Sequence, residues 1–377
     1  MRCRIPVVLA VMSCVLGFVS GAPAFAGQQD SAPSPGPARQ TPAEALYLAA
    51  CAACHGADGA GVAPSTVGFD TPLPDFSDCS FATREPDADW LAIAHQGGPV
   101  RAFDRRMPAF GEALAPDDLQ LTLDHIRTFC ADRAWPRGEL NLPRPLVTEK
   151  AYPEDEAVLS MAAAHGSVGH EFLYEKRFGP RSQVELVIPV EVAKQDGRGW
   201  RRGLGDVAVA VKHALFHSLE SGRILSASAE VVFPTGKENE GLGKGVTVFE
   251  PFVTFGQILG TDSFLQAQAG FELPANQDRA ENEAFWRLTV GRSLVEGAFG
   301  RTWSPMVEVL GARELGSGHA TAWDVVPQVQ ITLSRRQHVM MNVGVRIPVN
   351  ERSGRHTALL AYVLWDWFDG GFLDGWR

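Results

Sequence analysis

The clearest chemical motif in the sequence is Cys51-Ala52-Ala53-Cys54-His55. Two thiols at this spacing suit thioether bonds to the vinyl groups of a haem, and the following imidazole can bind the iron from one face. A zinc site would need further ligands at matching spacing, and none is evident. A thioredoxin-like pair of redox cysteines would normally lie next to a strand, and its chemistry does not require the histidine. The motif therefore predicts one covalently attached haem c.

Met107 is the candidate for the second axial ligand of the iron. It is the only methionine between the predicted export-signal cleavage site and the proline-rich segment near residue 134. A thioether ligand raises the reduction potential relative to a second imidazole. Two alternatives remain: Met107 only packs in the core, or His95, which precedes a glycine turn, binds the iron. His125 is expected to be packed or solvated, and no role is assigned to it.

The N-terminus predicts export. Two arginines and an apolar run from Ile5 to Val19 precede a small-residue stop at Ala24-Phe25-Ala26. This pattern is typical of a secretory signal peptide, here residues 1–26. Lipidation at Cys14 is the alternative, although the preceding residues suit it poorly. No later stretch reaches the roughly 18 consecutive apolar residues of a membrane-spanning helix.

The cysteines that remain after cleavage all lie before residue 131: Cys51, Cys54, Cys79 and Cys130. Cys79 and Cys130 are not part of the haem motif, and in an oxidising compartment they are expected to form a disulfide. Closing a loop of about 50 residues would stabilise the domain by about 4 kcal/mol in the chain-entropy model. The alternative is two free buried thiols. The formal net charge of -10 gives no sign of a nucleic-acid partner.

The first half of the chain reads as helical. Residues 27–40 are rich in Pro, Ser, Ala and Gln and predict a disordered leader. A compact domain is expected over residues 41–133, and four prolines then mark a linker over 134–156. Within the domain, a proline-started capping box and apolar periodicity predict three helices. They cover Pro42 to Cys51, Asp87 to His95 and Pro116 to Cys130.

The second half alternates apolar and polar residues, which is typical of antiparallel strands. About ten to twelve strands are expected over residues 157–368, followed by a tail over 369–377. The cleanest runs are Gln183 to Val192, Leu225 to Phe233, Ser263 to Leu273, Trp323 to Leu333 and His338 to Val349.

Nearly every predicted strand brings a charge to its polar face. Long strands of this kind, with aromatics near their ends, favour a transmembrane barrel with a wet lumen. A soluble sandwich that turns its apolar face inward is the alternative. The fold class predicted is a small all-α domain followed by an antiparallel outer-membrane β-barrel. The charged residues are Glu185, Asp206, Lys212, Glu230, Glu272, Arg287, Glu308, Asp324 and Arg346.

The segment from Thr41 to Cys130 resembles class I cytochrome c, because its haem motif follows a capped helix and Met107 is followed by a proline. The resemblance implies that Met107 ligates the iron opposite His55. The iron would then have no open position, so electron transfer is expected rather than catalysis.

The segment from Val168 to Phe368 resembles the outer-membrane barrels grouped with phenol-degradation transporters. The resemblance rests on three motifs in order: Gly203-Leu204-Gly205-Asp206-Val207, Val232-Phe233-Pro234-Thr235-Gly236 and Thr247-Val248-Phe249-Glu250-Pro251. The chain departs from such barrels by ending on Asp374-Gly375-Trp376-Arg377, so the last strand is expected to end at Phe368. The whole arrangement is similar to the fused cytochrome-porins of iron-oxidising bacteria.

The expected location is the outer membrane, with the haem domain on the periplasmic side. Three functions fit the sequence. The barrel could conduct electrons between an extracellular donor or acceptor and periplasmic redox proteins. It could transport a hydrophobic compound, although its charged inner face argues against this. It could also serve only as an anchor in outer-membrane lipid, which a blocked lumen would favour.

Overall fold

The computed structural model describes residues 40–70, 72–195, 199–260, 262–367, 370–371 and 373–376. The predicted signal peptide and nearly all of the predicted leader lie outside these residues. Thr41–Arg377 forms one compact unit. Among the helices described, none is long and apolar enough to cross a membrane.

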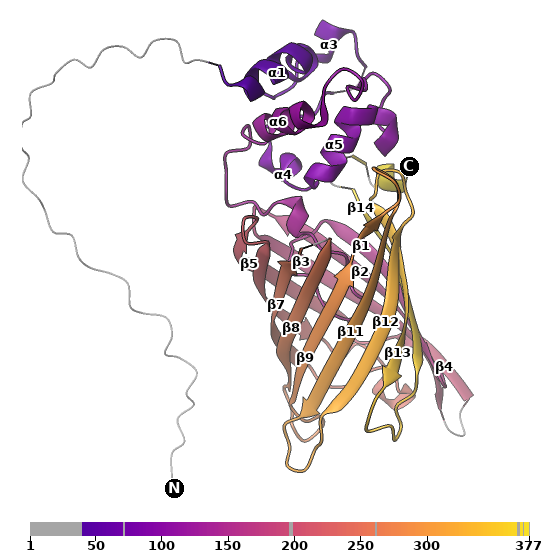
Figure 1. The fold of residues 1–377 in the computed structure, drawn as a ribbon. Coiled ribbons are helices and arrows are strands. Elements are labelled where there is room, and N and C mark those ends of the chain that lie inside the picture. Colours follow the sequence, from indigo (N-terminus) through magenta and orange to yellow (C-terminus); the bar gives the residue numbers. More distant parts are fainter. Residues whose placement is uncertain are drawn as a thin grey trace, which may run out of the picture. The chain divides into compact units, whose positions relative to one another are not determined.

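The N-terminal part of this unit is a small helical domain (Figure 1). The side chain of Thr41 caps the first helix by accepting a hydrogen bond from the Glu44 N–H at 3.1 Å, and a proline occupies the first turn. The helices of the domain are α1 (Pro42–Ala50), α2 (Ala52–His55), α3 (Pro64–Val67), α4 (Cys79–Ala82), α5 (Asp87–Gln96), η1 (Gly98–Arg101) and α6 (Pro116–Ile126).

The predicted helix over residues 116–130 ends earlier, at Ile126. The backbone N–H and the hydroxyl of Thr128 both bond to the carbonyl of His125, at 2.9 and 2.6 Å, which turns the chain out of the helix. The Arg127 guanidinium then bonds to the carbonyl of Glu85 at 2.9 Å. The last predicted turn is therefore a loop that carries Cys130.

Antiparallel strands fill the rest of the unit. They are β1 (Glu156–Ala164), β2 (Ser167–Phe178), β3 (Ser182–Gln195), β4 (Gly199–Leu204), β5 (Ala208–Ser218), β6 (Arg223–Val232), β7 (Val248–Ile258), β8 (Ser263–Pro274), β9 (Glu283–Arg292), β10 (Leu294–Val295), β11 (Thr302–Glu314), β12 (Ala322–Thr332), β13 (Val339–Pro348) and β14 (Ala358–Asp366). Short 3-10 turns η2 (Gly138–Leu140), η3 (Glu238–Glu240) and η4 (Asp374–Trp376) complete the described elements.

Twelve of the described strands close into a barrel. Figure 1 shows how these strands lie side by side along its wall. β1 pairs with both β2 and β14, and β9 pairs with β11, so the ring has no open edge. β4 pairs only with β3, and the short β10 pairs only with β11. The predicted barrel and its strand number are confirmed. The last strand ends at Asp366, while Phe368 lies outside the described residues.

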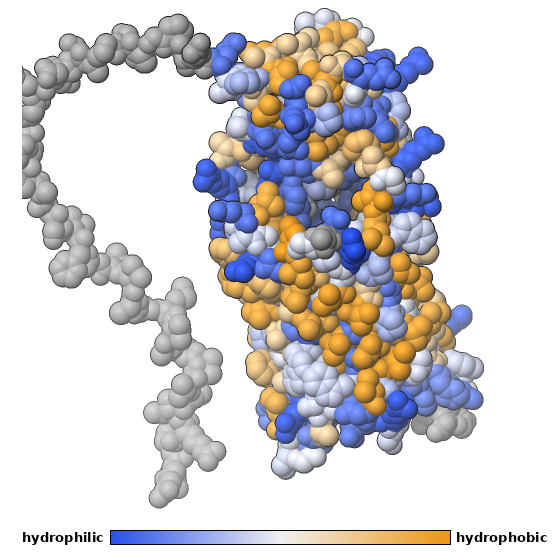
Figure 2. All heavy atoms as spheres, viewed as in Figure 1, coloured by the Kyte–Doolittle hydropathy of each residue, from blue (hydrophilic) through white to orange (hydrophobic). Residues whose placement is uncertain are grey.

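The two faces of the strands differ as predicted. On β3 the outward Val184, Leu186 and Val190 are exposed, whereas the inward Glu185 is buried. Figure 2 shows hydrophobic side chains gathered over the strands and hydrophilic ones nearer the loops. A closed sheet with an apolar outer face and a polar interior is the architecture of an outer-membrane barrel, and a soluble sandwich is excluded.

One residue assigned to the inner face lies elsewhere. Asp206 is in the connection between β4 and β5, where its carboxylate accepts the N–H groups of Gly236 and Lys244 at 2.9 and 2.6 Å. The Thr235 hydroxyl bonds to the carbonyl of Gly205 at 2.8 Å. The first two glycine-rich motifs therefore join two loops at one end of the barrel.

Candidate functional site

The Cys-x-x-Cys-His motif lies at the junction of α1 and α2. Cys51 ends α1 and bonds through its N–H to the carbonyl of Tyr47 at 2.8 Å, and the turn of α2 carries Cys54 and His55. Gly56 follows with a φ of +76°, where a side chain would be strained. The Tyr47 hydroxyl bonds to the Gly56 carbonyl at 2.6 Å. The chain therefore holds both thiols and the imidazole on one helical turn.

The imidazole of His55 is buried. It is 9 % exposed, and its ring stacks on Phe76 at 4.8 Å between centroids. Its Nδ1 is fully buried, and no residue in the described part of the chain bonds to it. Burial lowers the pKa of His55 to about 4. The imidazole is therefore neutral at neutral pH and can act as a metal ligand.

The two cysteines of the motif are unpaired and half-buried. Burial, with a smaller contribution from the nearby Cys54, raises the pKa of the Cys51 thiol to about 11. Disulfide oxidoreductases instead lower the pKa of their reactive thiol. Two unpaired cysteines beside a buried imidazole fit haem c, so Cys51 and Cys54 would hold its vinyl carbons and His55 its iron.

Met107 lies in the turn after η1 and is half-buried. Its carbonyl accepts the Gly98 N–H at 3.0 Å, and its own N–H bonds to the Asp104 carbonyl at 3.2 Å. These backbone bonds fix the turn that carries Met107 against the end of α5. None of the described contacts joins Met107 to His55, so its ligation remains a prediction.

Aromatic rings pack against His95, the alternative ligand, and against His125, to which no role is assigned. The ring of His95 lies 5.3 Å from that of Phe299, which belongs to the connection before β11, and a side chain at Gly111 would collide with it. His125 packs against the rings of Tyr47 and Phe129 at 5.2 and 5.1 Å. His125 was predicted to be either packed or solvated, and the structure shows that it is packed.

The structure contains the predicted disulfide between Cys79 and Cys130, with 5.1 Å between their Cα atoms. It joins the start of α4 to the loop after α6. The alternative of two free thiols is excluded.

We call residues 138–155 the plug; this segment begins with the 3-10 turn η2 and then continues without regular secondary structure through the interior of the barrel. Both carboxylate oxygens of Glu308 on β11 accept hydrogen bonds from it. The donors are the N–H groups of Leu146, Val147 and Thr148, at 2.8 to 3.1 Å, and the Thr148 hydroxyl at 2.6 Å. Glu308 is 0 % exposed and Thr148 is 2 % exposed. The plug therefore reaches the middle of β11.

Ion pairs also hold the plug to the barrel wall. Arg144 pairs with Glu156 at 2.7 Å and with Glu175 at 3.1 Å, and Lys150 pairs with Glu156 at 3.1 Å. All four side chains are less than a tenth exposed. Buried charges are costly unless they are paired, so these contacts fix the plug in one place.

Apolar and neutral polar contacts complete the packing of the plug. Leu140 and Tyr152 pack against Ile224, and Leu142 packs against Phe264. Plug carbonyls accept hydrogen bonds from the side chains of strands on several sides of the ring. The donors are Ser226, Gln266, Arg287, Asn342 and Tyr362.

The helical domain contacts one end of the barrel through several polar groups. The Arg101 guanidinium bonds to the carbonyl of Phe299 at 2.8 Å and to Asp89. His338 Nε2 lies 2.6 Å from Glu85 Oε1. Arg84 forms an ion pair with Asp155 of the plug.

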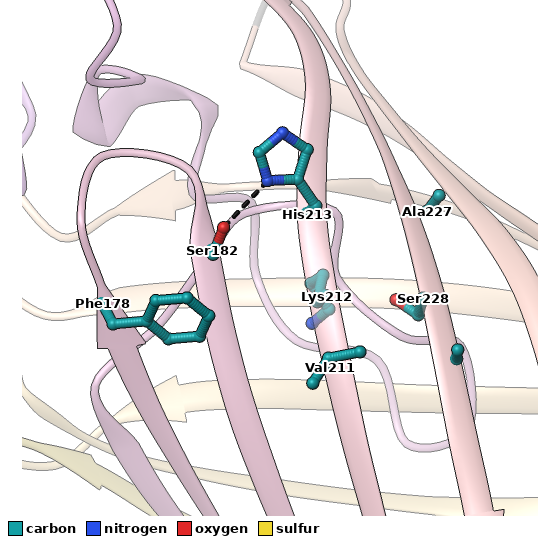
Figure 3. A pocket seen from close by; sticks show the side chains of 8 residues that line it. Phe178, Ser182, Val211, Lys212, His213, Ala227 and Ser228 are labelled. Carbon is teal, nitrogen blue, oxygen red and sulfur yellow. Dashed lines mark hydrogen bonds between the residues drawn. The ribbon is translucent and has the colours of Figure 1, made fainter. Parts of the chain in front are cut away.

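A shallow pocket of about 270 Å³ lies over β3, β5 and β6 (Figure 3). Ser182 Oγ and His213 Nδ1, on adjacent strands, are 2.8 Å apart there. A serine nucleophile needs a histidine that a third group orients. Among the described residues no carboxylate bonds to His213, so the pair is not a catalytic triad.

Residues 38–126 match the family model described as cytochrome C oxidase, cbb3-type, subunit III. This segment is a cytochrome c domain. A domain of this family carries covalently bound haem c, in agreement with the cysteines and the buried imidazole. A search of the curated proteins finds no match.

Solved structures similar to this chain include outer-membrane channels. An outer-membrane channel from Pseudomonas putida F1 is 14 % identical with a TM-score of 0.42, covering 59 % of this chain and 99 % of that one. The NanC porin is 9 % identical with a TM-score of 0.40, covering 56 % and 98 %. The KdgM porin in complex with disordered oligogalacturonate is 8 % identical with a TM-score of 0.38, covering 56 % and 99 %. At these TM-scores the likeness carries no inference about function.

The plug is the functional feature that the sequence did not predict. Its prolines predicted a linker, and many of its partners on the barrel are more than a hundred residues away in the chain, as Glu308 is from Thr148. One feature of the sequence could have indicated the plug: the predicted linker contains Arg144 and Lys150, and the predicted inner face of the barrel contains several glutamates.

Proposed function

We propose that this protein is a one-haem electron carrier whose barrel anchors it in the outer membrane and is closed by its own plug. One observation carries the proposal. In the middle of the barrel, the buried carboxylate of Glu308 accepts hydrogen bonds from the backbone N–H groups of Leu146, Val147 and Thr148. At the level of Glu308 the plug occupies the lumen and bonds to strands on several sides of the ring, which opposes free passage of a solute. Among the three functions that fit the sequence, this favours the anchor.

The haem supplies reversible one-electron exchange at its iron when it is bound. Cys51 and Cys54 would fix it through thioethers, and the neutral His55 and the thioether of Met107 would bind its iron from the two faces. Phe76 stacks on His55 and keeps water from its ring. Two protein ligands leave no open position, so the protein transfers electrons and does not activate a substrate at iron.

The lengths of the strand connections support a periplasmic haem domain. At the end that contacts the helical domain, most connections are short: 179–181, 219–222, 259–262 and 333–338, with a longer one at 293–301. At the other end, a tight turn at 165–166 is accompanied by longer connections at 233–247, 275–282, 315–321 and 349–357. Outer-membrane barrels place short turns in the periplasm and long loops outside.

The barrel interior opposes transport of a hydrophobic compound. The inner face beyond the plug is acidic on neighbouring strands, where Glu230 pairs directly with Glu250 and Glu272 with Glu283. An apolar solute would have to displace water from these carboxylates, which is unfavourable.

The proposal is tested by haem reduction in intact cells. A reductant too large to pass the outer membrane is added to cells that express the protein, and the reduced-haem absorbance is followed. The haem should stay oxidised until the outer membrane is breached, and then it should be reduced quickly by the same reagent. Rapid reduction in intact cells would show that electrons cross the barrel.

A further inference from the structure

The loops at the end of the barrel away from the helical domain bring together three metal-ligating side chains. Glu281 lies between β8 and β9, Glu314 ends β11, and His319 lies between β11 and β12. One ligand atom from each lies within 4.8 Å of the other two. His319 stands between the carboxylates, with Nδ1 2.8 Å from Glu314 Oε2 and Nε2 3.3 Å from Glu281 Oε2.

The backbone holds these side chains in place. Glu314 is paired with Glu283 in the ladder between β9 and β11, and the Leu315 N–H continues that ladder by bonding to the Asn282 carbonyl at 2.7 Å. Gly316 lets the carboxylate of Glu281 approach the chain, because a Cβ there would lie 2.2 Å from its Oε2. The site is therefore built from two loops that are bonded to each other.

The local charge favours a cation. Glu281 and Glu314 place two carboxylates beside the imidazole of His319, and Glu283 lies opposite Glu314 in the strand ladder. Like charges directly opposite in a strand pair, such as Glu283 and Glu314, are destabilising. Within the described ranges no lysine or arginine forms an ion pair with Glu281 or Glu314, since Arg279 pairs with Glu238 and Lys244 with Glu272.

We propose that Glu281, Glu314 and His319 form a binding site for a divalent transition-metal ion of the Zn²⁺ type. His319 Nε2 and Glu281 Oε2 bind the ion directly, and water fills its other positions. Ligands bonded at about 2.0–2.1 Å in a tetrahedral site lie roughly 3.3 Å apart, which matches the separation of these two atoms. One imidazole with carboxylates suits Zn²⁺, Co²⁺ or Mn²⁺ better than Ca²⁺ or Mg²⁺, which prefer oxygen ligands.

Glu314 has a different role in the proposed site. Its oxygen lies at hydrogen-bond distance from Nδ1, so it accepts the Nδ1–H and leaves Nε2 free for the metal. A carboxylate behind a metal-bound histidine fixes the tautomer and raises the basicity of the ligand. Glu314 is thus a positioning residue in this site.

The test is isothermal titration of Zn²⁺ into the detergent-purified holoprotein carrying no histidine tag. Wild type should bind one ion at this site. Glu281→Ala and His319→Ala should each abolish that binding phase, and Glu314→Gln should weaken it by about 10–100-fold. His356→Ala removes an exposed imidazole from another loop and should leave the phase unchanged.

Unchanged binding in both Glu281→Ala and His319→Ala would overturn the site, as would an equal loss in His356→Ala. Ca²⁺ at the same concentration should give the same heat of binding in wild type and in His319→Ala. A larger heat in wild type would show that the site does not prefer metals that bind imidazole. The haem absorbance and the heat-modified mobility of the barrel show that each variant is folded. The test is independent of the electron-transfer proposal, because it reads metal binding alone.

Discussion

The carboxylate of Glu308 bonds to both the backbone N–H and the hydroxyl of Thr148, at 2.8 and 2.6 Å. These residues are 160 positions apart, and both are almost completely buried. Without the plug this buried carboxylate would lose most of its hydrogen bonds, since Gln328 is its other donor among the described residues. The plug and the barrel wall therefore depend on each other for stability at this contact.

Replacing Glu308 should loosen the plug. Glu308→Ala removes the acceptor for three N–H groups and a hydroxyl, and hydrogen bonds to charged groups suggest a loss on the order of 3 kcal/mol. We expect wild type to show almost no conductance in planar bilayers and the variant to show frequent openings.

Glu272→Gln is the matched control for this measurement. Glu272 also faces the lumen, but it pairs with Lys244 in a loop and not with the plug. It should leave the conductance low. If Glu308→Ala were as silent as wild type while still folded, the plug would not depend on this carboxylate.

Met107→Ala tests the second axial ligand. Because Cys51 and Cys54 hold the haem covalently, the group should stay attached. Loss of the thioether opens a coordination position and lowers the reduction potential, since a thioether favours the ferrous state. The measurement is a visible redox titration with a spin-state spectrum, and an unchanged low-spin spectrum would exclude Met107.

His95→Ala is the companion variant in that experiment. His95 packs on Phe299, so its removal should leave the low-spin spectrum intact. A change in ligand field in this variant, with none in Met107→Ala, would transfer the ligand role to His95.

Local patterns explain which parts of the fold could be predicted from the sequence. The cap at Thr41, the haem motif and the alternation along β8 each depend on residues close in the chain, and the structure contains all three elements. The end of α6 at Ile126 was missed because a side-chain bond from Thr128 competes with the helix.

The plug could not be predicted because its energetics are non-local. Residues 138–155 have no apolar periodicity, and many of their backbone groups bond to side chains of distant strands. Only the closed ring brings Arg144 next to Glu175. Proline content indicated irregular structure correctly, but it cannot distinguish an exposed linker from one enclosed by a barrel.

Removing the disulfide should destabilise the cytochrome c domain. The bond spans 51 positions, for which the chain-entropy model gives about 4 kcal/mol. Cys79→Ala with Cys130→Ala should lower the midpoint of chemical unfolding, followed by the haem absorbance. The barrel should retain its heat-modified mobility, because neither cysteine lies in it. An unchanged midpoint would mean that strain in the native bond offsets its entropic effect.

The contact of His338 with Glu85 should weaken at alkaline pH. Burial alone would lower the pKa of His338, but Asp366 and Glu85, at 2.8 and 2.6 Å, outweigh it and hold that pKa well above its usual value. A raised pKa means that the stabilisation is complete below about pH 6.5 and is lost as pH rises through the raised value. Tryptic release of the haem fragment at the exposed Arg133 should therefore speed up with pH. His338→Gln is digested in parallel, so that the pH dependence of the protease itself can be subtracted. This variant should release its haem fragment quickly at every pH. Equal pH profiles of release for the two proteins would exclude His338 as the titrating group.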